Sequence, residues 1–91
     1  MWRLWFRKPL SPPEVILYTR PGCHLCEDAK DLLVEVGRTF GFQVQTVNIE
    51  ENPDLEQQHG LQIPVVQIDG IVRFRGRVNR VLLTRLLRGR T

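Results

Sequence analysis

The apolar positions in the first half of the chain follow two patterns, one typical of a buried strand and one of an amphipathic helix. Residues 15–19 are β-branched, apolar or aromatic in succession, which is typical of a central strand covered on both faces. A Pro-Gly dipeptide at 21–22 ends this run. Over residues 23–40 the apolar positions recur every three to four residues, so an amphipathic helix is predicted that stops at Gly41. Its apolar positions are Leu25, Cys26, Ala29, Leu32, Leu33, Val36 and Phe40.

Strand and helix patterns continue to alternate along the rest of the chain. Residues 43–49 are predicted to be a second strand, and a short helix is predicted from 52–54, Asn-Pro-Asp, to Gly60. Residues 63–68 and 71–74 are predicted strands joined by Asp-Gly, a dipeptide that tolerates the positive φ angles of a two-residue hairpin. A closing helix carries the apolar stripe Val78, Val81, Leu82, Leu83, Leu86 and Leu87, with Arg77, Arg80, Thr84 and Arg88 opposite.

The order of these elements, β-α-β-α-β-β-α, predicts an α/β fold with a four-stranded mixed sheet. The first three elements form a parallel βαβ unit with a right-handed crossover, and the hairpin extends the sheet antiparallel. The length of 91 residues fits one domain, which we assign to residues 14–91. Residues 1–13 contain Trp2, Trp5 and Phe6 and end in Ser-Pro-Pro, so we assign them to an N-terminal extension, either a free end or strap, or an interfacial anchor.

No membrane span and no secretory signal are expected from the pattern. Charged residues interrupt every hydrophobic run before it reaches the ~20 residues that a spanning helix needs. The basic N-terminal segment also lacks the apolar run of a signal peptide. Two cysteines three positions apart exclude a disulfide-stapled secreted scaffold, so a cytoplasmic protein is expected.

The net charge of +3 is unevenly distributed along the chain. Three basic residues lie in 1–13 and seven arginines in 73–91, whereas 14–72 holds three bases and all ten acids. Most of the arginines are expected on the wet face of the closing helix and along the hairpin. We therefore expect no nucleic-acid partner, and we interpret the asymmetry as a means of choosing an acidic partner protein. A non-catalytic binding module that uses the Arg-rich C-terminal helix is the alternative.

Cys23 and Cys26 are the candidate catalytic residues. Cys23 falls where a buried strand meets a helix N-terminus, whose positive dipole end favours the thiolate, the nucleophilic form of cysteine. Cys26 lies one helical turn further on the apolar stripe, so it is expected to be less exposed and less acidic, and able to resolve a mixed disulfide formed by Cys23. His24 either stabilises the thiolate when protonated or is an exposed residue without a role. His59 is expected at the surface.

A metal centre is the competing interpretation of the Cys-x-x-Cys pattern. A structural zinc site generally has four protein ligands, and the chain offers only two cysteines and two histidines. We therefore expect no metal ligand set within one chain. A metal or iron-sulfur carrier with a cluster shared between two chains stays as an alternative.

The motifs together resemble a known family. Residues 17–26, Leu-Tyr-Thr-Arg-Pro-Gly-Cys-His-Leu-Cys, then 60–66, Gly-Leu-Gln-Ile-Pro-Val-Val, and Asp-Gly at 69–70 are similar to short glutaredoxin-like proteins of the thioredoxin-fold superfamily. The resemblance covers about residues 14–88 and implies a thioredoxin-like fold. It also implies a cis bond between Ile63 and Pro64, and a backbone at Ile63 that a peptide or glutathione substrate contacts.

The resemblance further implies a thiol-disulfide oxidoreductase with a redox-active Cys23–Cys26 disulfide, which takes part in electron transport and cell redox homeostasis. Arg20 matches the family's lysine near a substrate carboxylate, so Arg20, His24, Ile63 and Pro64 are the predicted substrate-binding residues. Expected partners are protein or glutathione disulfides and a reductase, and the protein is expected to be a monomer. No resident cofactor is expected. Glutathione is left open as reductant because residues 76–79 hold one glycine and no acid where glutaredoxins carry a Gly-Gly-x-Asp-like segment.

Overall fold

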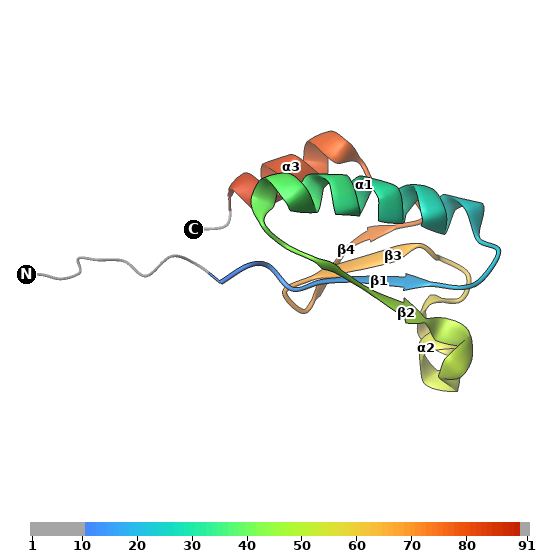
Figure 1. The fold of residues 1–91 in the computed structure, drawn as a ribbon. Helices are drawn as coiled ribbons and strands as arrows, with labels where there is room; N and C mark the ends of the chain where they lie inside the picture. The colour runs from blue at the N-terminus through green and yellow to red at the C-terminus, as the bar shows by residue number, and fades with distance from the viewer. Residues whose placement is uncertain (1–10, 90–91) are drawn as a thin grey trace, which may run out of the picture.

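The computed structural model describes residues 11–89, which form a four-stranded mixed sheet with helices packed on it (Figure 1). Helices α1 and α3 lie side by side over one face of the sheet, and α2 lies on the other side, beyond the end of β2 (Figure 1). The elements are β1 (Val15–Thr19), α1 (His24–Phe40), β2 (Val44–Asn48), the 3-10 turn η1 (Ile49–Glu51), α2 (Pro53–His59), β3 (Val65–Ile68), β4 (Ile71–Arg75) and α3 (Arg80–Arg88).

The sheet has the strand order β2-β1-β3-β4. β1 pairs in parallel with β2, with Val15 opposite Val44, and antiparallel with β3. β3 and β4 form the antiparallel hairpin, which contains a bulge beside Val66. The predicted α/β fold and its order of elements are confirmed, and η1 is an addition that the sequence pattern did not predict.

The predicted turn and helix ends are also found in the structure. Asp69 and Gly70 adopt φ angles of 52° and 83°, as the hairpin requires. Gly41 ends α1 in the left-handed conformation, and Asn52 caps α2 with its side chain. α3 starts later than its apolar stripe, because Asn79 accepts from the backbone N–H of Leu82 and fixes the first turn there.

The core lies between the sheet and the two helices above it. The buried apolar residues that pack together there are Val15, Leu17, Ala29, Leu33, Val36, Phe42, Val66, Ile68, Leu83 and Leu87. The apolar stripe predicted for the closing helix is too broad, since Val81 and Leu82 are 60% and 51% exposed. Leu83 and Leu87 are one turn apart and define the buried face, and each step of about 100° turns their neighbours away from it. Leu25, predicted on the stripe of α1, is 41% exposed for the same reason.

The proposed N-terminal extension falls mostly outside the described residues, which include only its positions 11–13. The three aromatic residues Trp2, Trp5 and Phe6 therefore have no structural description, and the alternatives for them stay predictions. Over residues 11–89, every helix is too short or too polar to cross a lipid bilayer.

Candidate functional site

Cys23 and Cys26 lie at the carboxyl end of β1, where the chain turns into α1. They form a disulfide with a Cα–Cα distance of 5.2 Å. Cys23 is the N-cap residue of α1 and is partly exposed, whereas Cys26 lies in the first turn and is 2% exposed. The predicted difference in exposure is therefore confirmed, and only one of the two sulfurs is accessible to a large partner.

The backbone of α1 supplies a hydrogen bond to the more exposed sulfur. The N–H of Cys26 donates to the Sγ of Cys23 over 3.2 Å, which is the bond that a helix-capping side chain accepts. In the reduced protein the same N–H and the positive end of the helix dipole stabilise a negative charge on this sulfur. The position thus favours the thiolate of Cys23 over that of Cys26.

His24 points away from the protein body. Its side chain is 88% exposed, and its Nε2 atom lies 3.8 Å from the Oδ2 atom of Asp28, one turn along α1. A pair as exposed as this one is strongly screened by solvent. The structure thus places His24 between the two cysteines in sequence, exposed at the surface, with Asp28 as a weakly interacting acidic neighbour.

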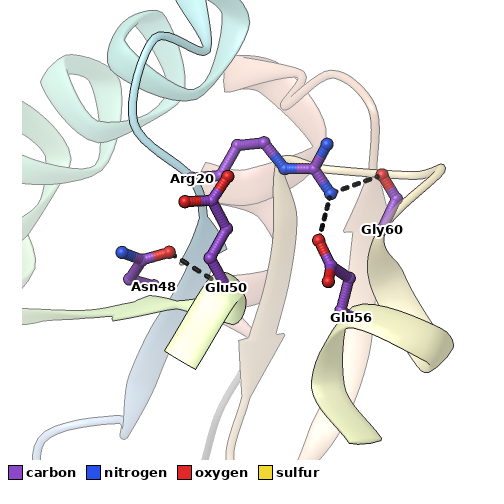
Figure 2. Close-up of polar contacts among 5 residues, drawn as sticks. All are labelled: Arg20, Asn48, Glu50, Glu56 and Gly60. Atoms are coloured by element: carbon purple, nitrogen blue, oxygen red, sulfur yellow. Dashed lines mark hydrogen bonds and ion pairs between the residues drawn. The ribbon is translucent and has the colours of Figure 1, made fainter. Parts of the chain in front are cut away.

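Arg20 joins the end of β1 to α2, as Figure 2 shows. Its Nη2 atom donates to the Oε2 atom of Glu56 over 3.4 Å and to the carbonyl oxygen of Gly60 over 3.3 Å. Its Nε atom is buried and has no hydrogen-bond partner among the described residues. The side chain predicted to bind a substrate carboxylate is thus occupied by contacts within the protein.

The same figure shows how the segment before α2 is fixed. The side chain of Asn48 accepts from the backbone N–H of Glu50 over 2.9 Å and so caps η1 (Figure 2). Asparagine is a favoured capping residue, but the predicted second strand, 43–49, includes Asn48, so the sequence pattern did not separate the cap from the strand.

The Ile63–Pro64 bond is cis, as the resemblance implies. Gly76, just after β4, donates its N–H to the carbonyl oxygens of both Gln62 and Pro64, over 2.9 and 2.8 Å. These two bonds hold the loop between β4 and α3 against the proline loop. Ile63 is partly exposed, and its predicted contact with a substrate stays a prediction.

Two hollows flank the cysteines. A cavity of about 240 Å³ reaches the buried Cys26 from the side of β2, and its lining includes Thr46, Glu27 and Lys30. A groove of about 200 Å³ on the other side lies between the first turns of α1 and the loop after β4. Its lining is Leu25, Asp28, Ala29, Leu32, Gly76, Arg77 and Val78.

His59 was predicted to be a surface residue, and the structure places it against the sheet. Its ring lies 4.6 Å from the ring of Tyr18, centroid to centroid. Burial against the sheet lowers the pKa of His59, and the positive charge of Arg75 lowers it further. No local sequence signal predicts this contact, because it depends on how α2 folds back onto β1.

Metal-ligating side chains do not gather elsewhere in the described part of the chain. Over residues 11–89, no three or more His, Cys, Asp or Glu side chains lie close enough together to hold a metal ion. The two cysteines are joined to each other instead.

Comparison with known proteins gives relatives of the same architecture. An uncharacterised protein of Mycobacterium tuberculosis is 35% identical over 66 residues, which is 67% of this chain and 68% of the relative. A thioredoxin of Methanocaldococcus jannaschii is 29% identical over 84 residues, or 89% of this chain and 99% of that protein. Among solved structures, a protein of X. campestris has a TM-score of 0.68 at 28% identity, covering 85% of this chain and 99% of its own.

The oxidised mitochondrial thioredoxin 3 of Saccharomyces cerevisiae has the same fold, with a TM-score of 0.61 at 16% identity over 85% of this chain and 77% of its own. The match to the thioredoxin of Methanocaldococcus jannaschii and the Cys23–Cys26 disulfide together support a redox role. A family model described as a glutaredoxin-like domain (DUF836) matches residues 14–88, which is nearly the whole described chain. The chain belongs to this glutaredoxin-like family and has the thioredoxin fold.

Proposed function

We propose that the protein is a thiol-disulfide oxidoreductase in which Cys23 attacks and Cys26 resolves. The observation that carries this proposal is the disulfide at the N-terminus of α1, with one sulfur accessible and hydrogen-bonded by the helix and the other buried. This asymmetry supports different roles for two residues of the same chemistry.

The reaction follows from the positions of the two sulfurs. In the reduced protein the Cys23 thiolate attacks one sulfur of a substrate disulfide, which forms a mixed disulfide and releases the first substrate thiolate. Cys26 then loses its proton and attacks the Cys23 sulfur, which closes the intramolecular disulfide and releases the second substrate thiolate. The two substrate thiolates then take up two protons, one released by Cys26 and one from solvent, so two electrons pass from the protein to the substrate.

The substrates and partners are proposed from the family and from its relatives. The substrate class is a protein disulfide or glutathione disulfide, bound through the backbone of Ile63 beside the cis-proline and through exposed His24. A reductase of the thioredoxin type or glutathione returns the Cys23–Cys26 pair to the thiol form. The proposed setting is the cytoplasm, where this pair would carry electrons in redox homeostasis.

Two cysteine variants test the assignment of roles. Cys23→Ser should abolish reduction of a disulfide-linked peptide, because the attacking sulfur is gone. Cys26→Ser should accumulate a mixed disulfide between the protein and one peptide, visible as a mass increase that a strong reductant reverses. If Cys23→Ser kept the activity of the parent protein, the assignment of the nucleophile would be lost.

The thiolate and the reductant can be tested separately. The alkylation rate of Cys23 against pH should titrate below the free-cysteine value of about 8.5. A titration at or above that value would contradict the helix argument. Turnover supported by glutathione, compared with turnover supported by a thioredoxin-type reductase, decides which reductant serves the pair. A stoichiometric metal in the purified protein would favour the cluster-carrier alternative.

A further inference from the structure

Two arginines, Arg75 and Arg77, stand on either side of the glycine that anchors the loop after β4. Gly76 is held by its two hydrogen bonds to the carbonyl oxygens of Gln62 and Pro64. Because these bonds fix the backbone between the arginines, both guanidinium groups extend from a point tied to the proline loop. Both residues are exposed.

The two side chains lie on opposite sides of this anchor. Arg77 lines the groove that also includes Leu25, the residue next to Cys26. Arg75 pairs with Val65, the residue after the cis-proline, and its charge reaches His59 on the other side of the sheet. The two arginines therefore place positive charge on both sides of the loop that Gly76 ties to the proline loop.

Neither charge is neutralised within the described part of the protein. The ion pairs there join Arg20 to Glu56, His24 to Asp28 and Arg80 to Glu35, and none of them involves Arg75 or Arg77. Glu56 on α2 is already paired with Arg20. Arg77 at the groove and Arg75 on the other side of the Gly76 anchor present positive charges that carboxylates on a partner can complement.

The groove has room for an apolar side chain between Asp28 and Arg77. Its floor is apolar, formed by Leu25, Ala29, Leu32 and Val78, and its volume is about 200 Å³. Asp28 borders it on the α1 side, where His24 is its neighbour, and Arg77 borders it on the loop side. A polypeptide segment with an aliphatic residue and acidic neighbours fits this arrangement.

We propose that Arg75 and Arg77 select acidic polypeptides as the disulfide substrates of this protein. The inference rests on the proposed function and narrows it to one substrate class. A polypeptide is favoured over a nucleic acid because Arg77 shares its groove with Leu25, the residue before Cys26, and a substrate of this cysteine pair must bring a disulfide. The reaction is the one described above, in which the protein dithiol is oxidised and the substrate disulfide becomes two thiols.

The test uses three peptide disulfides that differ only in the residues around cysteine: Asp and Glu, Asn and Gln, or Lys. Each carries a fluorophore and a quencher on its two halves, so that reduction is read as fluorescence from the pre-reduced, full-length protein. The parent protein should reduce the acidic peptide roughly 10-fold faster than the lysine peptide at low salt. This preference should shrink in 0.5 M salt, because screening shortens the range of the field.

Charge reversal locates the effect. Arg75→Glu with Arg77→Glu should reverse the order of the peptides, and the corresponding glutamine variants should level it. The matched control is Arg85→Glu with Arg88→Glu, which changes the net charge equally on the exposed surface of α3 and should keep the order of the parent. Circular dichroism checks that each variant is folded.

The outcomes separate this inference from the proposed function. If the parent reduces none of the peptides, the proposed function fails and the inference fails with it. If it reduces all three equally, or if Arg75→Glu with Arg77→Glu keeps the acidic preference, the function stands and the inference is overturned. Binding of a DNA oligonucleotide that this double change abolishes, without any peptide preference, would assign the arginines to nucleic acid and likewise overturn it.

Discussion

The contact between Arg20 and Glu56 links α2 to the end of β1, and its contribution to stability can be measured. The Glu56→Gln substitution removes the charge of one partner while leaving Arg20 and its bond to the Gly60 carbonyl in place. We expect this substitution to lower the free energy of unfolding slightly, and the structure sets the size of the effect.

The geometry and the exposure of the pair both point to a small value. The two side chains are 32% and 50% exposed, so solvent screens the interaction, and exposed ion pairs contribute about 0.2–1 kcal/mol. The separation of 3.4 Å is longer than a good charge-assisted hydrogen bond, which places this pair in the lower half of that range, at about 0.2–0.5 kcal/mol. For a domain of this size that is a Tm lower by about 1–4 °C.

A double-mutant cycle with Arg20→Gln isolates the pair. Arg20→Gln also removes the buried Nε atom that lacks a partner, and losing an unsatisfied donor offsets part of the cost. The effect of losing this Nε atom is the same with and without the Glu56→Gln change, so it cancels from the coupling energy. Urea unfolding of the four proteins should give a coupling of about 0.2–0.5 kcal/mol, and the coupling should fall in 1 M salt, where the Debye length is about 3 Å.

The reasoning would be refuted by zero coupling together with a raised KM of Arg20→Gln for a substrate disulfide that bears carboxylates. Arg20 would then act on the substrate, as the family resemblance implies, and its contact with Glu56 would contribute nothing to folding. In that case Glu56→Gln should lower the KM, because it frees the guanidinium group.

Three further predictions concern stability and are checked by equilibrium unfolding. Leu33→Ala should lower the unfolding free energy by about 2–5 kcal/mol, because Leu33 is fully buried in the core; a loss below 1 kcal/mol would contradict its packing. Gly37→Ala should lower the Tm although alanine is the better helix former by about 1 kcal/mol, because the new Cβ would lie 2.5 Å from the carbonyl oxygen of Phe42; a higher Tm would show that this contact relaxes. His59 has a lowered pKa in the fold, so the unfolded state binds its proton more readily and stability should fall as pH drops below about 6.5; His59→Gln should remove this part of the pH dependence, and an unchanged profile would count against it.

The sequence pattern was sufficient for the elements whose ends are set by local chemistry. Asp69-Gly70, Asn52 and Gly41 each have a conformation or a side-chain bond that neighbouring residues determine, and the structure has a turn or a cap at each of them. The helix N-terminus at Cys23 belongs to the same class, which is why the unequal exposure of the two cysteines could be predicted.

Features that depend on distant parts of the chain could not be predicted in this way. Val81 and Leu82 are apolar, yet the direction in which α3 packs on the sheet leaves them exposed. Arg20 has no local signal for its contact with Glu56, 36 positions later in the chain. The ring contact of His59 with Tyr18 also requires the whole βαβ unit to be in place.

The two hydrogen bonds of Gly76 fix the backbone of the loop after β4 independently of the side chains on either side of it. The Cys23–Cys26 disulfide lies at the N-terminus of α1, whereas Arg75 and Arg77 flank the glycine that binds the backbone of Gln62 and Pro64. Exchange of the side chains at 75 and 77 leaves those backbone bonds intact. A laboratory library restricted to these two positions can therefore change the charge of this loop without removing the backbone bonds that hold it.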